Sequence, residues 1–112
     1  MTTLMGERDK AVLDALTACH QSCESCGYGC CTSGDLEVCS RFCFDCATVC
    51  RATATLVARG SPRAFAVAEA CARICEECAA ECGKHDDALC RECAEVCRSG
   101  AEACRKLAAS AA

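Results

Sequence analysis

The chain has 112 residues, 17 of them cysteine, and a formal net charge of −4 with both signs interspersed. That charge pattern gives no sign of a nucleic-acid surface, and no apolar run is long enough to cross a membrane. The length fits one domain over residues 1–112. Leu, Ile, Val and Phe together also number 17. Since buried thiols behave as small hydrophobic groups, cysteine must supply about half of the interior.

The first residues, MTTLMGERDKAV, carry charges where a signal peptide needs an apolar stretch. We therefore expect a cytoplasmic protein in a reducing compartment, where structural disulfides are rare. The odd number of cysteines also excludes complete pairing within one chain.

The first two predicted helices lie near 5–31 and 35–59. They are separated by the turn Ser33-Gly34-Asp35, in which Asp35 can cap the second helix. Gly60-Ser61-Pro62 follows the second helix and supplies a C-terminal glycine, a capping serine and a proline for the first turn of the next helix.

The third and fourth predicted helices lie near 62–83 and 86–109. Gly83 ends the third, and Asp86 or Asp87 can cap the fourth. The connections are short, and the alternating pattern of strands is absent. The sequence therefore predicts an all-α fold, an antiparallel up-down-up-down four-helix bundle with a cysteine-lined core.

Cysteines recur in these helices with the spacing of an apolar stripe. The segment CARICEECAAEC, residues 71–82, places them at steps of four, three and four, which keeps every thiol on one helix face. Three segments read C-x3-C-x2-C-x3-C, and a fourth would match from Cys93 onward if Gly100 were a cysteine. The groups are Cys19, Cys23, Cys26, Cys30; Cys39, Cys43, Cys46, Cys50; Cys71, Cys75, Cys78, Cys82; and Cys90, Cys93, Cys97, Cys104.

In such a bundle the thiols gather toward one end. The first and third helices carry cysteines in their C-terminal halves, and the second and fourth mostly in their N-terminal halves. The connections between helices one and two and between helices three and four lie at that same end. The stripes continue the other way as apolar residues, which we expect to close the opposite end: Val12, Leu16, Val57, Phe65 or Ala68, and Leu107.

Each C-x3-C pair has the reach to hold one soft metal ion. Residues i and i+4 of a helix have Cβ atoms about 5–6 Å apart. Two sulfurs bridged by one ion lie roughly 4–4.6 Å apart when the metal–sulfur bond is about 2.3 Å. Sites made only of thiolates favour Cu(I) first and Zn(II) second. The ligands would hold about 8 ions if no sulfur is shared, and toward about 17 if sulfurs bridge.

Other interpretations of the cysteines remain open. Four C-x2-C pairs have the spacing of a redox dithiol, but none lies in a βαβ context, and the ferredoxin spacing with its following proline is absent. The alternatives are a zinc or general soft-metal detoxification protein, a disulfide-stapled or thiol-redox-regulated structural bundle, and thiols that only fill the core.

The three repeats, together with CEECAAECGKHDDALCRECAEVCRSGAEAC (75–104), resemble the bacterial four-helix-bundle copper storage proteins over nearly the whole chain. Without an export signal, the resemblance is to the cytosolic branch. It implies a homotetramer of bundles, each holding many Cu(I) ions through C-x3-C pairs. The implied pairs are Cys19/Cys23, Cys26/Cys30, Cys39/Cys43, Cys46/Cys50, Cys71/Cys75, Cys78/Cys82 and Cys93/Cys97. Cys90 and Cys104 lack a helical partner and would bridge across helices.

Two positions depart from that family pattern. Gly100 stands where relatives usually carry a cysteine, so fewer ions are expected near Cys104. Relatives tend to have several histidines around the 83–90 turn, and here only His85 is present. His85 could receive or cap an entering ion, or be a solvated turn residue.

Four further residues have open roles. Cys31 is rotated off the stripe near Cys39, as either an entry ligand or an exposed thiol. His20 points about 100° away from the stripe, which favours a surface role. Gly27 and Gly29 interrupt the first helix, either for the close approach of a neighbouring helix or for a wider mouth.

The sequence thus predicts high-capacity storage of Cu(I), with many ions per chain. No Ser/His/Asp set, phosphate loop or paired catalytic carboxylates can be assembled, so we expect no enzyme. A small thiol or a metallochaperone is the expected copper donor, at the end near His85, and neither nucleic acid nor a membrane is an expected partner. The predicted metal ligands are Cys19, Cys23, Cys26, Cys30, Cys31, Cys39, Cys43, Cys46, Cys50, Cys71, Cys75, Cys78, Cys82, His85, Cys90, Cys93, Cys97 and Cys104.

Overall fold

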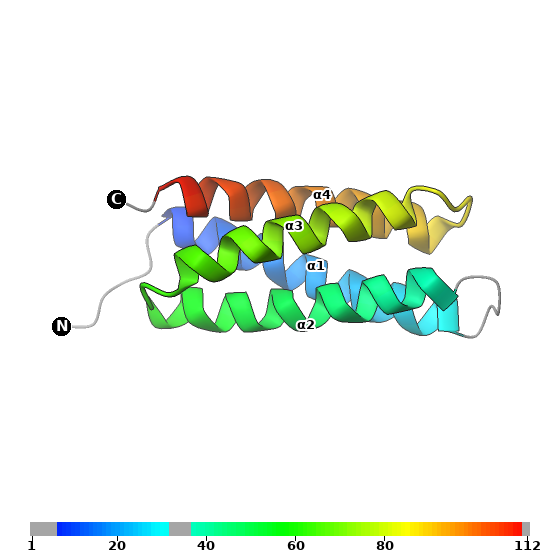
Figure 1. The fold of residues 1–112 in the computed structure, drawn as a ribbon, viewed down its shortest axis with the longest axis horizontal. Helices are drawn as coiled ribbons and strands as arrows, with labels where there is room; N and C mark the ends of the chain where they lie inside the picture. Colours follow the sequence, from blue (N-terminus) through cyan, green and yellow to red (C-terminus); the bar gives the residue numbers. More distant parts are fainter. Residues whose placement is uncertain (1–6, 32–36, 111–112) are drawn as a thin grey trace.

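A computed structural model describes residues 7–31 and 37–110 of the chain. It consists of four antiparallel helices, as predicted (Figure 1). None of the helices in these residues is long and apolar enough to span a membrane. The bounds are α1 Glu7–Cys31, α2 Glu37–Arg59, α3 Ala64–Cys82 and α4 Ala88–Ala109.

The helix ends follow most of the predicted signals. Gly60 takes a positive φ of 70°, the left-handed conformation in which glycine ends a helix without strain. Asp87 caps α4, because its side chain accepts hydrogen bonds from the backbone N–H groups of Leu89 at 2.9 Å and Cys90 at 3.2 Å. The predicted cap Asp35 lies outside the described residues.

The start of α3 differs from the prediction by two residues. Ser61 and Pro62 form a turn before the helix, in which the Ala64 N–H donates to the Ser61 carbonyl at 3.0 Å. The Ser61 hydroxyl accepts from the Arg63 N–H at 3.2 Å instead of capping a helix that begins at Pro62. The serine therefore holds the turn, and α3 begins at Ala64.

Each helix packs against its two neighbours in the order α1, α2, α3, α4 and back to α1. The C-terminal ends of α1 and α3 and the N-terminal ends of α2 and α4 lie at the same end of the bundle (Figure 1). The opposite end is closed by apolar side chains, as predicted, with Ala68 fully buried and Phe65 only half-buried. The buried residues of this apolar end are Val12, Leu16, Val57, Ala64, Ala68 and Leu107.

The two glycines of α1 serve the close approach of neighbouring helices. A Cβ at Gly27 would lie 2.8 Å from Cε1 of the Phe44 ring on α2. A Cβ at Gly29 would lie 3.1 Å from Cδ1 of Leu89 on α4. The absence of side chains at these positions lets Phe44 and Leu89 close on α1 from both sides.

Candidate metal-binding core

The cysteine stripes of all four helices face the bundle axis. Sixteen cysteines have described side chains, all are buried, and none forms a disulfide. The most accessible of them, Cys30, has only 3% of its surface exposed. Cys31 ends α1, but its side chain lies outside the described part. The four helices therefore enclose one continuous region of thiols.

The structure brings together the thiols of all seven cysteine pairs that the family resemblance implied. For five of them, the two Sγ atoms lie 3.8–4.0 Å apart. The other two, Cys19/Cys23 and Cys39/Cys43, each belong to a group of four thiols whose Sγ atoms all lie within 4.8 Å of one another. These spacings equal van der Waals contact between thiols and are shorter than the roughly 4.6 Å across a two-coordinate ion.

Thiols also contact one another across the bundle. The Sγ of Cys19 on α1 lies 3.9 Å from that of Cys46 on α2, 3.9 Å from that of Cys75 on α3 and 3.6 Å from that of Cys97 on α4. One thiol of α1 thus meets a thiol of every other helix. An ion bound between the helices could pass from one sulfur to the next without leaving the thiol region.

Cys90 and Cys104 bridge between helices in place of an i+4 partner. The Sγ of Cys90 lies 3.8 Å from those of Cys26 and Cys30 on α1, and 4.0 Å from that of Cys39 on α2. Cys104 is fully buried, and hydrogen bonding with Cys71 on α3 raises its pKa. Both thiols therefore contact cysteines of other helices, where the resemblance implies that they would bridge.

Gly100 is a site of close packing as well as a missing thiol. A Cβ built there would lie 3.3 Å from Cβ and 3.4 Å from Sγ of Cys19, and 3.8 Å from Sγ of Cys75. Cys19 therefore occupies much of the space that a side chain at position 100 would need. The glycine allows the contacts of Cys19 with its three partner helices.

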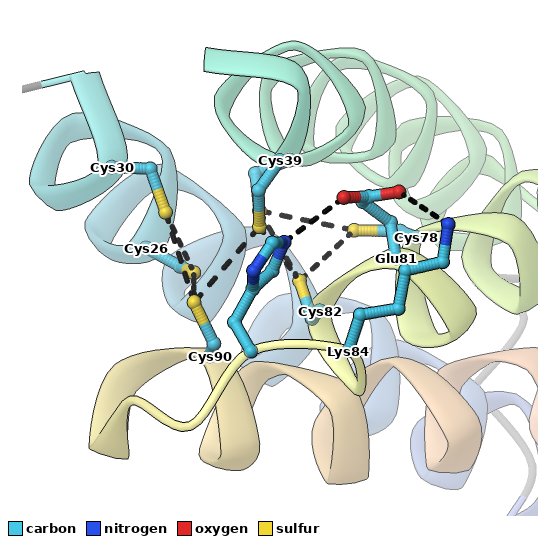
Figure 2. A network of polar contacts seen from close by, with 10 residues as sticks. Cys26, Cys30, Cys39, Cys78, Glu81, Cys82, Lys84 and Cys90 are labelled. Atoms are coloured by element: carbon cyan, nitrogen blue, oxygen red, sulfur yellow. Dashed lines mark hydrogen bonds and ion pairs between the residues drawn. The ribbon is translucent and has the colours of Figure 1, made fainter. Parts of the chain in front are cut away.

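At the thiol-rich end, a charged cluster stands beside the sulfurs (Figure 2). The Glu81 carboxylate contacts Nε2 of His85 at 2.9 Å and accepts from Nζ of Lys84 at 3.1 Å. Those two partners, His85 first, hold the pKa of Glu81 below its ordinary value. His85 is among the residues predicted from the sequence, and Glu81 is not, although the i, i+4 spacing of an acid and a histidine indicates such a pair.

His20 has a structural partner away from the thiols. It is half-buried, and its Nδ1 lies 3.2 Å from the backbone carbonyl oxygen of Ala47 on α2. A second tie joins the same two helices, where the Ser40 hydroxyl donates to the Gly27 carbonyl at 3.0 Å. The sequence favoured a surface role for His20, whereas the structure half-buries its ring against α2.

Three thiols of the thiol-rich end, Cys30, Cys39 and Cys90, favour their neutral form. Burial raises the pKa of Cys90 to about 11 and also raises the pKa values of Cys30 and Cys39. A metal ion that binds these thiols must therefore displace their protons. Neutral thiols avoid the cost of buried charge while no metal is bound.

Two surface cavities lie apart from the thiols. One of about 650 Å³ is lined by residues of α3 and α4 that include Arg73, Ile74 and Arg105. Another of about 340 Å³ lies between α2 and α3 beside Phe42 and Val49. No described cysteine lines either cavity, so neither shares the chemistry of the core.

Comparisons with known proteins agree with this geometry. The Cu(I)-bound copper storage protein Csp3 of Bacillus subtilis is 33% identical, and the match covers 91% of this chain and 99% of that one with a TM-score of 0.87. A cytosolic copper storage protein from Streptomyces lividans, with five coppers, is 37% identical over 93% of this chain and 94% of that one, at a TM-score of 0.87. The Streptomyces protein Ccsp loaded with 10 copper equivalents is 35% identical over 97% and 92%, at a TM-score of 0.89.

The family model described as "Copper storage protein" matches residues 5–109, which include every cysteine of the chain. By this match and by the fold that it shares with the two relatives, the chain belongs to the copper storage protein family.

Proposed function

We propose that this protein stores Cu(I), many ions per chain, on the cysteine thiolates inside its four-helix bundle. The observation that carries the proposal is the continuous network of buried thiols, in which neighbouring Sγ atoms from all four helices lie 3.4–4.0 Å apart. Soft ligands at this density suit Cu(I), which binds two or three sulfurs without a four-ligand cage.

The sixteen described core cysteines are the proposed ligands, with Cys31 and His85 as candidates for the entry. Copper would enter at the thiol-rich end, where His85 and Glu81 adjoin the sulfurs. It would then move inward by thiolate exchange, and each thiol would lose its proton as it binds. A small thiol or a metallochaperone is the proposed donor.

Storage in the cytoplasm fits the relative from Streptomyces, which is a cytosolic copper storage protein. We also propose that the protein is not an enzyme, since its thiols are buried in contact with one another and not arranged around a substrate cavity. A homo-oligomer, a tetramer by the family resemblance, is supported by half-buried apolar side chains at steps of seven along α2. These are Phe42, Val49 and Leu56.

An anaerobic titration of the fully reduced protein with Cu(I), in competition with a Cu(I) chelator, tests storage. We expect tight uptake of on the order of ten or more ions per chain. Uptake of only one or two ions would contradict the proposal. Circular dichroism of the metal-free protein provides a companion test, because neutral buried thiols should keep the bundle helical before any copper binds.

A further inference from the structure

Six thiols at the end of the bundle beside Glu81 form two groups of four that share two members. Within each group, all Sγ atoms lie within 4.8 Å of one another. One group is Cys26, Cys30, Cys39 and Cys90, and the other is Cys26, Cys39, Cys43 and Cys82. We call these six residues the mouth module. Figure 2 shows Cys26, Cys30, Cys39, Cys82 and Cys90 converging there from the four helices.

The spacing of these thiols matches tetrahedral coordination. With a metal–sulfur bond of about 2.3 Å, as for zinc, the edge of a tetrahedron of sulfurs is about 3.8 Å. In the first group, the Sγ of Cys90 lies 3.8 Å from those of Cys26 and Cys30 and 4.0 Å from that of Cys39. The Sγ atoms of Cys26 and Cys30 also lie 3.8 Å apart.

Two edges of the second group have a similar length, and all of its Sγ atoms lie within 4.8 Å of one another. The Sγ of Cys82 lies 3.5 Å from that of Cys39 and 3.6 Å from that of Cys43. A tetrahedral ion in each group would use Cys26 and Cys39 in common. Those two sulfurs would bridge the ions, and the other four would each bind one ion.

The net charge of the site favours two shared thiolates when both bound ions are dications. Two separate sites of four thiolates each would carry eight negative charges against four positive ones, a net charge of −4. Two ions that share two thiolates need only six, which halves the net charge to −2. Since burying net charge is costly, the shared arrangement is the better one for a nearly enclosed site.

Groups of four thiols that share two members also occur deeper in the bundle. Cys19 and Cys46 are common to the groups Cys19, Cys46, Cys50, Cys75 and Cys19, Cys23, Cys46, Cys97. All six of these thiols are fully buried, whereas Cys26 and Cys30 of the mouth module retain slight exposure. A metal–thiolate cluster with a net negative charge is therefore better solvated at the mouth module than at the inner groups. An entering ion also reaches the mouth module first.

We propose that the mouth module binds a pair of Zn(II) ions bridged by the thiolates of Cys26 and Cys39. Zinc is the dication that prefers four thiolates in a tetrahedron. Six thiols lose six protons to solvent as the two ions bind, which is three protons per zinc, and no electron is transferred. Cu(I) would later displace the zinc, because thiolates select it more strongly.

The test is a zinc titration of the reduced, copper-free protein against a zinc chelator, followed by native mass spectrometry and by measurement of the released protons. We expect the tightest step to take up two zinc ions and to release three protons for each. Cys39→Ser removes a bridging thiolate and should lose both ions. Cys30→Ser removes a terminal one and should leave a single ion bound.

Cys46→Ser is the matched control, because Cys46 is the shared thiol of the inner pair of groups, lies on the same helix as Cys39 and is equally buried. It should keep both ions. Cys26→Ser, the other bridge, repeats the test if Cys39→Ser lacks wild-type helix content by circular dichroism.

Equal zinc uptake by the Cys39 and Cys46 variants would overturn the proposal. Loss of zinc by the Cys46 variant alone would also overturn it, and so would the release of four protons for each zinc ion bound. The Cu(I) titration is a separate measurement. A protein without the zinc pair can still store copper, so the two proposals fail independently.

Discussion

The two ends of the bundle have cores of different side chains. The apolar end is filled by side chains such as Leu16 and Leu107, and the other end by thiols that contact one another at 3.4–4.0 Å. A buried leucine removes more apolar surface from water than a cysteine and makes more close contacts. We infer that the apolar end supplies a large share of the free energy of folding, which leaves the thiol end free to be chosen for its metal chemistry.

The largest expected effect separates these two roles. Leu16→Ala removes a fully buried side chain from the apolar end and should lower the free energy of unfolding by about 2–5 kcal/mol. Copper capacity should stay at the wild-type value, since Leu16 is no ligand. Chemical denaturation and Cu(I) titration of the same sample would test both statements. Loss of capacity in a folded variant would show that the two ends are not independent.

A substitution of a core cysteine should have the opposite effect, a loss of copper capacity with a smaller loss of stability. The Sγ of Cys75 lies within 4.0 Å of those of four other cysteines, at 3.6 Å from Cys50 and 3.7 Å from Cys46. Cys75→Ser should reduce uptake by about one to two Cu(I) ions per chain. It should destabilise the metal-free protein less than Leu16→Ala does. Cys104→Ser, with fewer thiol neighbours, should show the smaller loss of copper of the two variants.

A substitution at Gly27, against which the Phe44 ring packs, should change the free energy of unfolding by less. The sign of this change should depend on whether Phe44 is present. Alanine at this position gains about 1 kcal/mol of helix propensity over glycine, but its Cβ would lie 2.8 Å from the Phe44 ring. We expect Gly27→Ala to destabilise the wild-type protein. In a Phe44→Ala background the same change should be stabilising. A double-mutant cycle by thermal or chemical unfolding measures this reversal, and an unchanged sign would mean that the ring does not pack against Gly27.

The smallest expected effect is at the surface. The Arg105 guanidinium donates to both carboxylate oxygens of Glu76, at 2.7 and 3.1 Å, and this lowers the pKa of Glu76. Because that pKa is lowered by folding, the pair contributes stability above the ordinary carboxyl pKa, and the contribution disappears as the pH falls through the lowered value. Arg105→Gln should therefore differ slightly from wild type at neutral pH and low salt, and not at all in strong acid. A difference that persisted in acid would point to lost packing of the arginine stem.

Much of this architecture could be predicted from the sequence, because a stripe at steps of four, three and four constrains a helix strongly. The stripe gave the inward face of each helix, and the punctuation at Gly60 and Asp87 gave the ends. The predicted bundle, its thiol-rich end and its apolar end were therefore confirmed. Which thiols of different helices meet could not be predicted, since this depends on the axial offset and rotation of each helix against its neighbours.

Two features of the site depended on such offsets. Gly100 looked only like a missing ligand, but the side chain of Cys19 on another helix lies over it. The six-thiol groups combine residues from several helices, and no spacing within a single helix reveals them. The start of α3 was placed two residues early for a local reason, because Ser61 and Pro62 form a turn that resembles a helix start in sequence.

Cysteine is repeated along the bundle axis, and this repetition affects what fixes the axial register of the helices. A core of equal, small, flexible thiols offers little shape by which one sliding position is distinguished from the next. Alignment must then depend on features that occur once, and Gly27 with the Phe44 ring is such a feature, together with the Ser40 hydroxyl that binds the Gly27 carbonyl. The thiol stripe could therefore gain or lose a cysteine with little change in topology, whereas the contact of Gly27 with the Phe44 ring could not shift by one helical turn.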